Sequence, residues 1–140
     1  MTIMPWSEAK RPLPRRSSHS RVARGVAAHA SGHAAERLVA ERYAERGCEI
    51  LERCWRSPAG EVDLILRDGA TVVFVEVKKS GSHGIAAQRI SRRQMDRICQ
   101  AALLYTDRLP TGGLTELRFD AALVDADGRV QIVENAFGLN

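Results

Sequence analysis

The chain has few aromatic residues, few cysteines and no long apolar run. Phe, Trp and Tyr make up 5% of its 140 residues, so it offers no set of aromatic platforms on which single-stranded bases would stack. Cys48, Cys54 and Cys99 lack the paired spacing of zinc or redox-dithiol sites. No apolar stretch approaches the ~20 residues of a membrane-spanning helix, and the first residues form no apolar signal-peptide core. We therefore expect a soluble, cytoplasmic protein with three ordinary thiols and no membrane partner.

Acidic residues are scarce at the start of the chain, and this scarcity accounts for the basic pI of about 9.3. Residues 1–28 hold six of the 21 Lys and Arg residues and one of the 17 Asp and Glu residues, which leaves 15 basic and 16 acidic residues elsewhere. This Pro-, Arg- and Ser-containing segment cannot bury enough apolar surface to order itself. We expect a flexible basic extension over 1–28 and a single domain over 29–140. The arginines of the extension either contact phosphates or are simply solvated.

Hydrophobic periodicity predicts the element order αβββαββ. Helices are expected from Ser31 to about Gly47 and from Ser91 to just before Pro110. Strands are expected over 49–55, 62–66, 71–78, 117–124 and 130–133, with Ile50 as the clearest apolar position of the first. The third strand is apolar at both parities, which favours a central position covered on both faces. The expected fold class is α/β, with a mixed central β-sheet flanked by helices.

Each predicted helix carries one apolar stripe. The stripes consist of Ala35, Leu38, Val39 and Tyr43 in the first helix and of Met95, Ile98, Cys99, Ala102 and Leu103 in the second. Glu36 lies on the flank of the first stripe, so its carboxylate is able to face inward. Ser91 with Gln94 has the form of a capping box at the start of the second helix.

The second and third strands carry charged residues at alternate positions, and residues two apart share a face. If these strands pair, Asp63 converges with Glu76 and Lys78. Carboxylates that close repel unless a proton or a cation lies between them, and Mg²⁺ or Mn²⁺ prefers oxygen ligands. Two carboxylates and one backbone carbonyl, that of Val77, would suffice. The ammonium group of Lys78 would then steady an attacking water and the charge that develops on a phosphate.

These charged residues also have simpler interpretations. An acidic strand residue commonly lies on a solvated face, and Glu76 and Lys78 can form a plain ion pair, although that pair leaves Asp63 unexplained. Four further residues are candidates for contacts with nucleic acid, namely Glu61, Lys79, Arg93 and Gln94. Strand alternation points Lys79 away from Lys78, towards the rim. The N-terminus of the second helix can approach a phosphate, but the capping box already accounts for Gln94.

Four segments of the chain resemble the YraN-like family. These are uncharacterised bacterial proteins of the PD-(D/E)XK nuclease superfamily, similar to archaeal Holliday-junction resolvases. The segments are Gly32–Glu36, Gly60–Ile65, Phe74–Lys78 and Arg118–Asp120. The resemblance extends from about residue 25 to about residue 137, which is nearly everything but the extension.

The resemblance implies a restriction-endonuclease-like core and a Mg²⁺- or Mn²⁺-dependent endonuclease that cuts DNA at branched or structured sites, in repair or recombination. It implies that Asp63 and Glu76 hold the metal, that Lys78 assists the water, and that Glu36 completes the acidic cluster through metal or water. It also suggests a homodimer that places two sites on two strands. The alternatives are a nucleic-acid-binding module that retains the fold without cutting, and a structural partner in a larger complex.

The chain departs from the family pattern at four positions. Val62 replaces a proline before Asp63, and Cys54 replaces an asparagine. Ser80 and Arg93 replace an arginine and a lysine. These departures concern backbone shape and phosphate contacts, and they leave the carboxylates in place.

Overall fold

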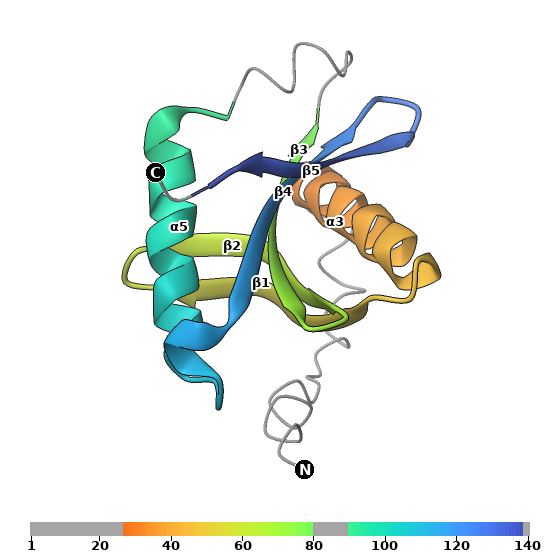
Figure 1. Ribbon diagram of the computed structural model, residues 1–140. Coiled ribbons are helices and arrows are strands. Elements are labelled where there is room, and N and C mark those ends of the chain that lie inside the picture. Colours follow the sequence, from red (N-terminus) through yellow and green to blue (C-terminus); the bar gives the residue numbers. More distant parts are fainter. Residues whose placement is uncertain (1–26, 80–89, 139–140) are drawn as a thin grey trace.

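The computed structural model describes residues 27–79 and 90–138 (Figure 1). Its helices are α3 (Ala27–Glu45), α5 (Arg92–Thr106) and the short 3-10 helix η2 (Gly112–Leu114). Its strands are β1 (Glu49–Ser57), β2 (Gly60–Asp68), β3 (Thr71–Lys79), β4 (Glu116–Val124) and β5 (Val130–Phe137). The predicted αβββαββ order and the α/β class are confirmed. None of the helices in these ranges has the length and apolarity to cross a membrane.

Two sequence-based predictions fall mainly on other parts of the chain. The extension predicted over 1–28 lies outside the described residues except for its last two positions, which belong to α3. The loop predicted after Lys79, with Ser80, also lies outside them.

The five strands form one mixed sheet in the order β1-β2-β3-β4-β5. Three neighbouring pairs are antiparallel, and β3 pairs with β4 in parallel. A parallel pair needs a long crossover, and α5 with η2 supplies it. The central strand β3 is buried from Val72 to Glu76, as its apolar composition at both parities predicts.

The two helices cover opposite faces of this sheet, and a separate apolar cluster lies beneath each (Figure 1). Under α3 the buried residues include Ala35, Val39 and Tyr43, as predicted. Leu38 was expected in the same stripe, but its side chain is 37% exposed. It lines a hollow together with Gly128 of the β4–β5 turn, because it is rotated by one residue from the centre of the stripe.

Under α5 the stripe prediction is right for Ile98, Cys99 and Ala102, and wrong for Leu103, which is 45% exposed. Ala101 and Tyr105 are buried in addition. The centre of the buried face is therefore rotated away from Leu103, which leaves the leucine on the outer flank of the helix.

Strand β1 places apolar side chains on both faces of the sheet. Ile50, its clearest apolar position in the sequence, is half-buried against the cluster under α3, and Leu51 is buried at 2% exposure in the cluster under α5. The register shifts between Ile50 and Glu52, and an extra residue in one strand changes which side chains face inward. Cys54, later in the same strand, has a left-handed φ of 49°.

Strand β5 continues to Phe137, past the predicted end at Val133, because it pairs with β4 as far as Phe119 across a second register shift.

Candidate metal centre

The candidate site lies where β2 and β3 separate. Their ladder runs from the hairpin turn to Leu64 and Val75 and stops there. Beyond this point β2 continues to pair with β1, and β3 with β4. The side chain of Asp63 takes the place of the missing backbone acceptor, because its Oδ2 accepts a hydrogen bond from the Val77 N–H at 2.8 Å. This strand fork therefore holds the Asp63 carboxyl beside that of Glu76, as alternation predicted.

The electrostatics of the fork show that the two carboxyl groups crowd each other. Burial, then repulsion from Glu76, raises the pKa of Asp63 to about 8, although the Val77 N–H opposes the rise. Burial also raises the pKa of Glu76, and Lys78 limits that rise. Two carboxyl groups this close retain a proton between them at neutral pH. A cation in place of that proton would relieve the same repulsion, so the donor set fits a hard divalent metal.

Lys78 and Gln94 complete the α5 side of the fork. The Lys78 Nζ lies 3.4 Å from Glu76 Oε2 and donates to Gln94 Oε1 at 3.2 Å. The Gln94 Nε2 donates to the same Glu76 oxygen at 2.5 Å. One amide thus spans the carboxylate and the ammonium, and fixes both. Lys79 is exposed and lines the hollow on the α3 side, which agrees with the alternation that separated the two lysines.

The capping-box prediction accounts for only half of what Gln94 does. Its backbone N–H donates to Ser91 Oγ at 3.1 Å, as the box requires. Its side chain, however, contacts Glu76 and Lys78. Because the sequence pattern had already assigned the side chain to the helix end, sequence reasoning underrated Gln94 as a member of the site.

Helix α3 brings Glu36 to the other side of the fork. Glu36 is half-buried, and its negative charge adds to the rise in the pKa of both Asp63 and Glu76. Its Oε1 accepts a hydrogen bond from Cys54 Sγ at 3.1 Å. Burial, and then this bond, raises the pKa of the Cys54 thiol well above its usual range, so the thiol stays protonated and remains a donor.

Sequence reasoning did not foresee the contact between Cys54 and Glu36. The one signal in the sequence was that Cys54 stands where the family pattern has an asparagine. Asparagine tolerates a left-handed backbone and offers an N–H donor. Both properties suit this position, because Cys54 has a φ of 49° and its side chain donates a hydrogen bond to Glu36.

The remaining predicted residues lie further out. Glu61 is exposed and 4.0 Å from Arg56, and its charge reaches Asp63 only as a lesser contribution to the raised pKa. Arg93 is exposed on the first turn of α5. Across 27–79 and 90–138, no three His, Cys, Asp or Glu side chains form a metal-ligand set by themselves. A metal held by Asp63 and Glu76 would therefore draw its other ligands from a backbone carbonyl, water or substrate oxygens.

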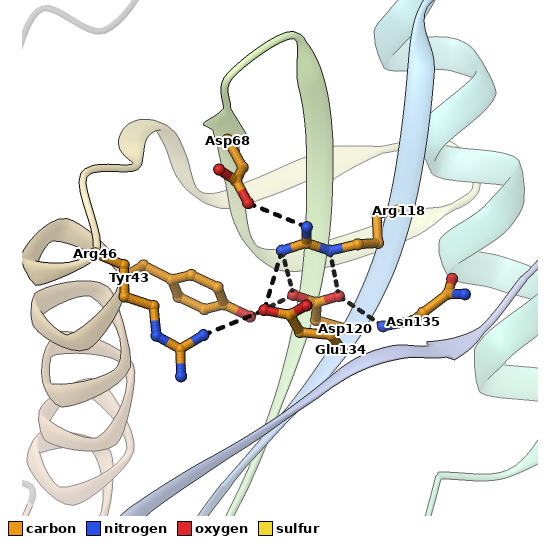
Figure 2. A network of polar contacts seen from close by, with 7 residues as sticks. All are labelled: Tyr43, Arg46, Asp68, Arg118, Asp120, Glu134 and Asn135. Carbon is orange, nitrogen blue, oxygen red and sulfur yellow. Dashed lines mark hydrogen bonds and ion pairs between the residues drawn. The ribbon is translucent and has the colours of Figure 1, made fainter.

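A second polar network ties the α3 face of the sheet together (Figure 2). Asp120 is 0% exposed and accepts two hydrogen bonds from Arg118, at 3.0 and 3.1 Å. The Tyr43 hydroxyl donates to it at 2.7 Å and the Asn135 N–H at 3.0 Å. A buried carboxylate with four donors is fully satisfied, so it has no lone pair left for a ligand.

The same network links more distant elements. Arg118 also donates to Asp68, at the β2–β3 hairpin, at 3.1 Å. Burial, and then the charge of Asp120, raises the pKa of Tyr43 far above its ordinary value, which keeps the hydroxyl a donor. Tyr43 stands two helical turns after Glu36 on α3. The network therefore anchors the helix that presents Glu36 to the fork.

A mixed five-stranded sheet between two helices, with two acidic side chains and a lysine where its second and third strands separate, defines a protein with a restriction-endonuclease-like core. The model of a family described as "Uncharacterised protein family UPF0102" matches residues 35–124. The chain belongs to this family, the YraN-like proteins, as the sequence resemblance predicted. The match includes Glu36, Asp63, Glu76 and Lys78.

Curated relatives cover most of the chain. A UPF0102 protein of Cereibacter sphaeroides is 54% identical over 113 residues, which are 81% of this chain and 97% of that protein. A UPF0102 protein of Ruegeria pomeroyi is 50% identical over 115 residues, covering 82% and 94%. One from Dinoroseobacter shibae is 44% identical over 135 residues, covering 96% and 98%.

Proposed function

We propose that this protein is a metal-dependent endonuclease that hydrolyses phosphodiester bonds in DNA. The observation that carries the proposal is the crowded pair of Asp63 and Glu76, with the pKa of Asp63 raised to about 8, beside the ammonium group of Lys78. Perturbed carboxyl groups next to a positioned cation are typical of catalytic sites. Family membership supports the fold, and the site supplies the chemistry.

Each residue at the fork has a task in this mechanism. Asp63, Glu76 and the Val77 carbonyl would hold a Mg²⁺ or Mn²⁺ ion. When bound, such an ion supplies Lewis-acid polarisation of the phosphate and a more acidic water. Lys78 orients the attacking water and stabilises the charge that develops on the phosphate oxygens. Gln94 keeps the Glu76 carboxylate and the Lys78 ammonium in fixed relative positions.

The two acidic side chains favour cleavage over binding alone. A module that only binds DNA gains nothing from buried carboxylates, because they repel phosphate and raise the free energy of the folded protein. The resemblance supplies three further parts of the proposal. The substrate is branched or structured DNA, the protein acts in the cytoplasm, and exposed cations such as Lys79 and Arg93 contact the phosphates.

A cleavage assay tests the proposal. Linear, single-stranded, flapped and four-way DNA would be incubated with the protein in Mg²⁺, in Mn²⁺ or in chelator. We expect cutting only with metal, and a loss of about 10²- to 10³-fold in rate for Glu76→Gln and for Lys78→Met. Glu116→Gln is the matched control, because Glu116 is an exposed acidic residue of the same sheet that pairs with Thr71, away from the fork. Cutting in chelator, or unchanged rates in both variants, would contradict the mechanism, and tight binding without cutting would favour the binding module.

Calorimetry gives a readout that does not depend on activity. Because the carboxyl pair retains a proton at neutral pH, metal binding must release it. We therefore expect a binding heat that varies with the ionisation enthalpy of the buffer at about pH 7 and an apparent affinity that rises towards about pH 8. A metal affinity that is independent of pH would show that the ion does not compete with this proton.

A further inference from the structure

Most arginines in the described part of the chain have an acidic or aromatic partner. Arg46 Nη1 lies 3.3 Å from Glu134 Oε2, and Arg92 Nε lies 3.6 Å from Asp96 Oδ1. Four exposed arginine side chains, however, form no ion pair, hydrogen bond or ring contact with any residue of 27–79 or 90–138. They are Arg37, Arg53, Arg93 and Arg97, and we call them the fork arginines because they surround the strand fork.

Two fork arginines lie on α5. Arg93 directly precedes Gln94, whose side chain contacts Glu76. Arg97 follows one turn later and passes beside Gly60 at the start of β2, where a Cβ atom would lie 3.7 Å from Arg97 Cδ. The β1–β2 turn and the first turns of α5 therefore hold both guanidinium groups at the α5 side of the fork.

The position of this α5 pair is unfavourable for the protein alone. Like charges four residues apart on a helix repel each other, and Arg93 and Arg97 have this spacing. The first turn of α5 contains no acidic residue, so Arg93 also lies against the positive end of the helix dipole. The fold gains no stability from these charges, whereas a bound anion would interact favourably with both of them.

The other two fork arginines lie on the α3 side. Arg37 directly follows Glu36, and Arg53 directly precedes Cys54, whose thiol donates to Glu36. Arg53 is paired across the β1–β2 ladder with Leu64, which belongs to the apolar cluster under α3. Directly opposite residues of two paired strands share a face, so the Arg53 side chain lies on the α3 face of the sheet. Both arginines thus flank the helix residue that completes the acidic cluster.

We propose that the fork arginines bind phosphate groups of the DNA on both sides of the bond that is cut. This inference rests on the proposed nuclease function. The fork carboxyl groups repel phosphate, and the chain beyond its first 28 residues has 15 basic and 16 acidic residues, so DNA binding needs cations gathered near the site. Unpaired arginines supply them, because their guanidinium groups bind phosphate without first breaking an ion pair.

The two pairs also define the form of the substrate. The helices α3 and α5 cover opposite faces of the sheet (Figure 1), and the fork opens at one end of the sheet between them. A DNA backbone that contacts both pairs crosses this end from one face to the other, with the phosphate to be cut between them. The substrate is therefore a backbone that continues on both sides of the fork, and a strand that ends at the fork loses the contacts of one pair.

The salt dependence of DNA binding tests the proposal without any cutting. Fluorescence anisotropy would follow the full chain binding to labelled duplex DNA in chelator, over a series of salt concentrations. Each phosphate contact contributes about 0.9 to the slope of log Kd against log salt concentration. Arg→Gln at each fork arginine should therefore lower the slope by about 0.9, whereas Arg→Lys, which keeps the charge, should preserve it.

Two double variants test the two-sided geometry. Arg37→Gln with Arg53→Gln, and Arg93→Gln with Arg97→Gln, should each lower the slope by about 1.8, because each pair contacts the same DNA. Loss of slope in only one of the double variants would overturn the two-sided contact. Unchanged slopes in both, or no binding of DNA by the wild-type chain, would overturn the proposal altogether.

Matched controls separate DNA contact from folding. Arg46→Gln removes the same charge from an exposed side chain roughly 15 Å along α3 from Glu36 and should leave the slope unchanged. Arg93→Gln and Arg97→Gln should melt at or above the wild-type temperature, because each relieves the repulsion within α5. A fall in melting temperature would show that these two arginines stabilise the fold, and would contradict their assignment to DNA.

The binding assay and the cleavage assay fail independently. Lower slopes in the variants of a protein that never cuts DNA would keep the arginine assignment and refute the nuclease. Metal-dependent cutting with unchanged slopes would keep the nuclease and refute the arginine assignment.

Discussion

Asp63→Asn should stabilise the metal-free protein. In the unfolded chain Asp63 has its ordinary pKa of 3.8, and in the folded protein the pKa is about 8. Between these values the folded state binds more protons than the unfolded state, so the free energy of unfolding falls as pH rises. The raised pKa thus measures how strongly the fold resists ionisation of this carboxyl. Asparagine removes the ionisable group and still offers Val77 N–H an acceptor.

The size of the effect follows from the shift. One pKa unit corresponds to about 1.4 kcal/mol, so at about pH 7 the upper limit for Asp63 is roughly 4 kcal/mol. Asp63 is only half-buried, and it shares the proton with Glu76. Water screens part of the repulsion, so we expect a gain of about 1–3 kcal/mol near pH 8. The gain should shrink as pH falls and be mostly lost by about pH 4, close to the ordinary pKa of 3.8, because it vanishes only below that pKa, where both folded and unfolded chains keep the proton.

Urea denaturation in chelator, repeated from about pH 4 to about pH 8.5, measures this dependence. Glu116→Gln is the control, because Glu116 is an exposed acidic residue of the same sheet that pairs with Thr71, at the other end of β3 from the fork. With Mg²⁺ added, wild type should gain stability through binding and the variant should not, so the difference should shrink. A difference that stays constant over this pH range, or an Asp63→Asn protein less stable than wild type near pH 8, would refute the reasoning.

Three further substitutions test the contacts around the site. Tyr43→Phe removes one donor from the fully buried Asp120 and should cost about 1–3 kcal/mol in denaturant unfolding, with helix content unchanged in the folded protein. Cys54→Asn should be neutral or stabilising because asparagine tolerates a left-handed φ, whereas Cys54→Val should cost about 1–3 kcal/mol, and thermal melts would separate the two. Gln94→Glu places a third carboxylate against Glu76, so its thermal melting temperature should fall below that of Gln94→Ala as pH rises from about 5 to 8, and equal melting temperatures would contradict the assigned contact.

The sequence was sufficient for most of the fold because its signals are local. Apolar residues repeat about every two positions in strands and about every 3.6 positions in helices, whichever element follows. The same periodicity separated Lys78 from Lys79 and set Asp63 against Glu76 once neighbouring strands were assumed to pair. It failed at Leu38 and Leu103, where a stripe is wider than the surface that it covers.

What the sequence by itself determined is the order of the elements, the family, and the charged residues that two strands present on one face. Only the tertiary structure decided which partners those residues have. Gln94 meets Glu76 across 18 positions, Cys54 meets Glu36 across 18, and Tyr43 meets Asp120 across 77. Local sequence patterns do not predict such contacts, because the contacts form only when the sheet brings distant segments together. The raised pKa of Asp63 belongs to the same category, since burial and neighbouring charge are properties of the packed fold.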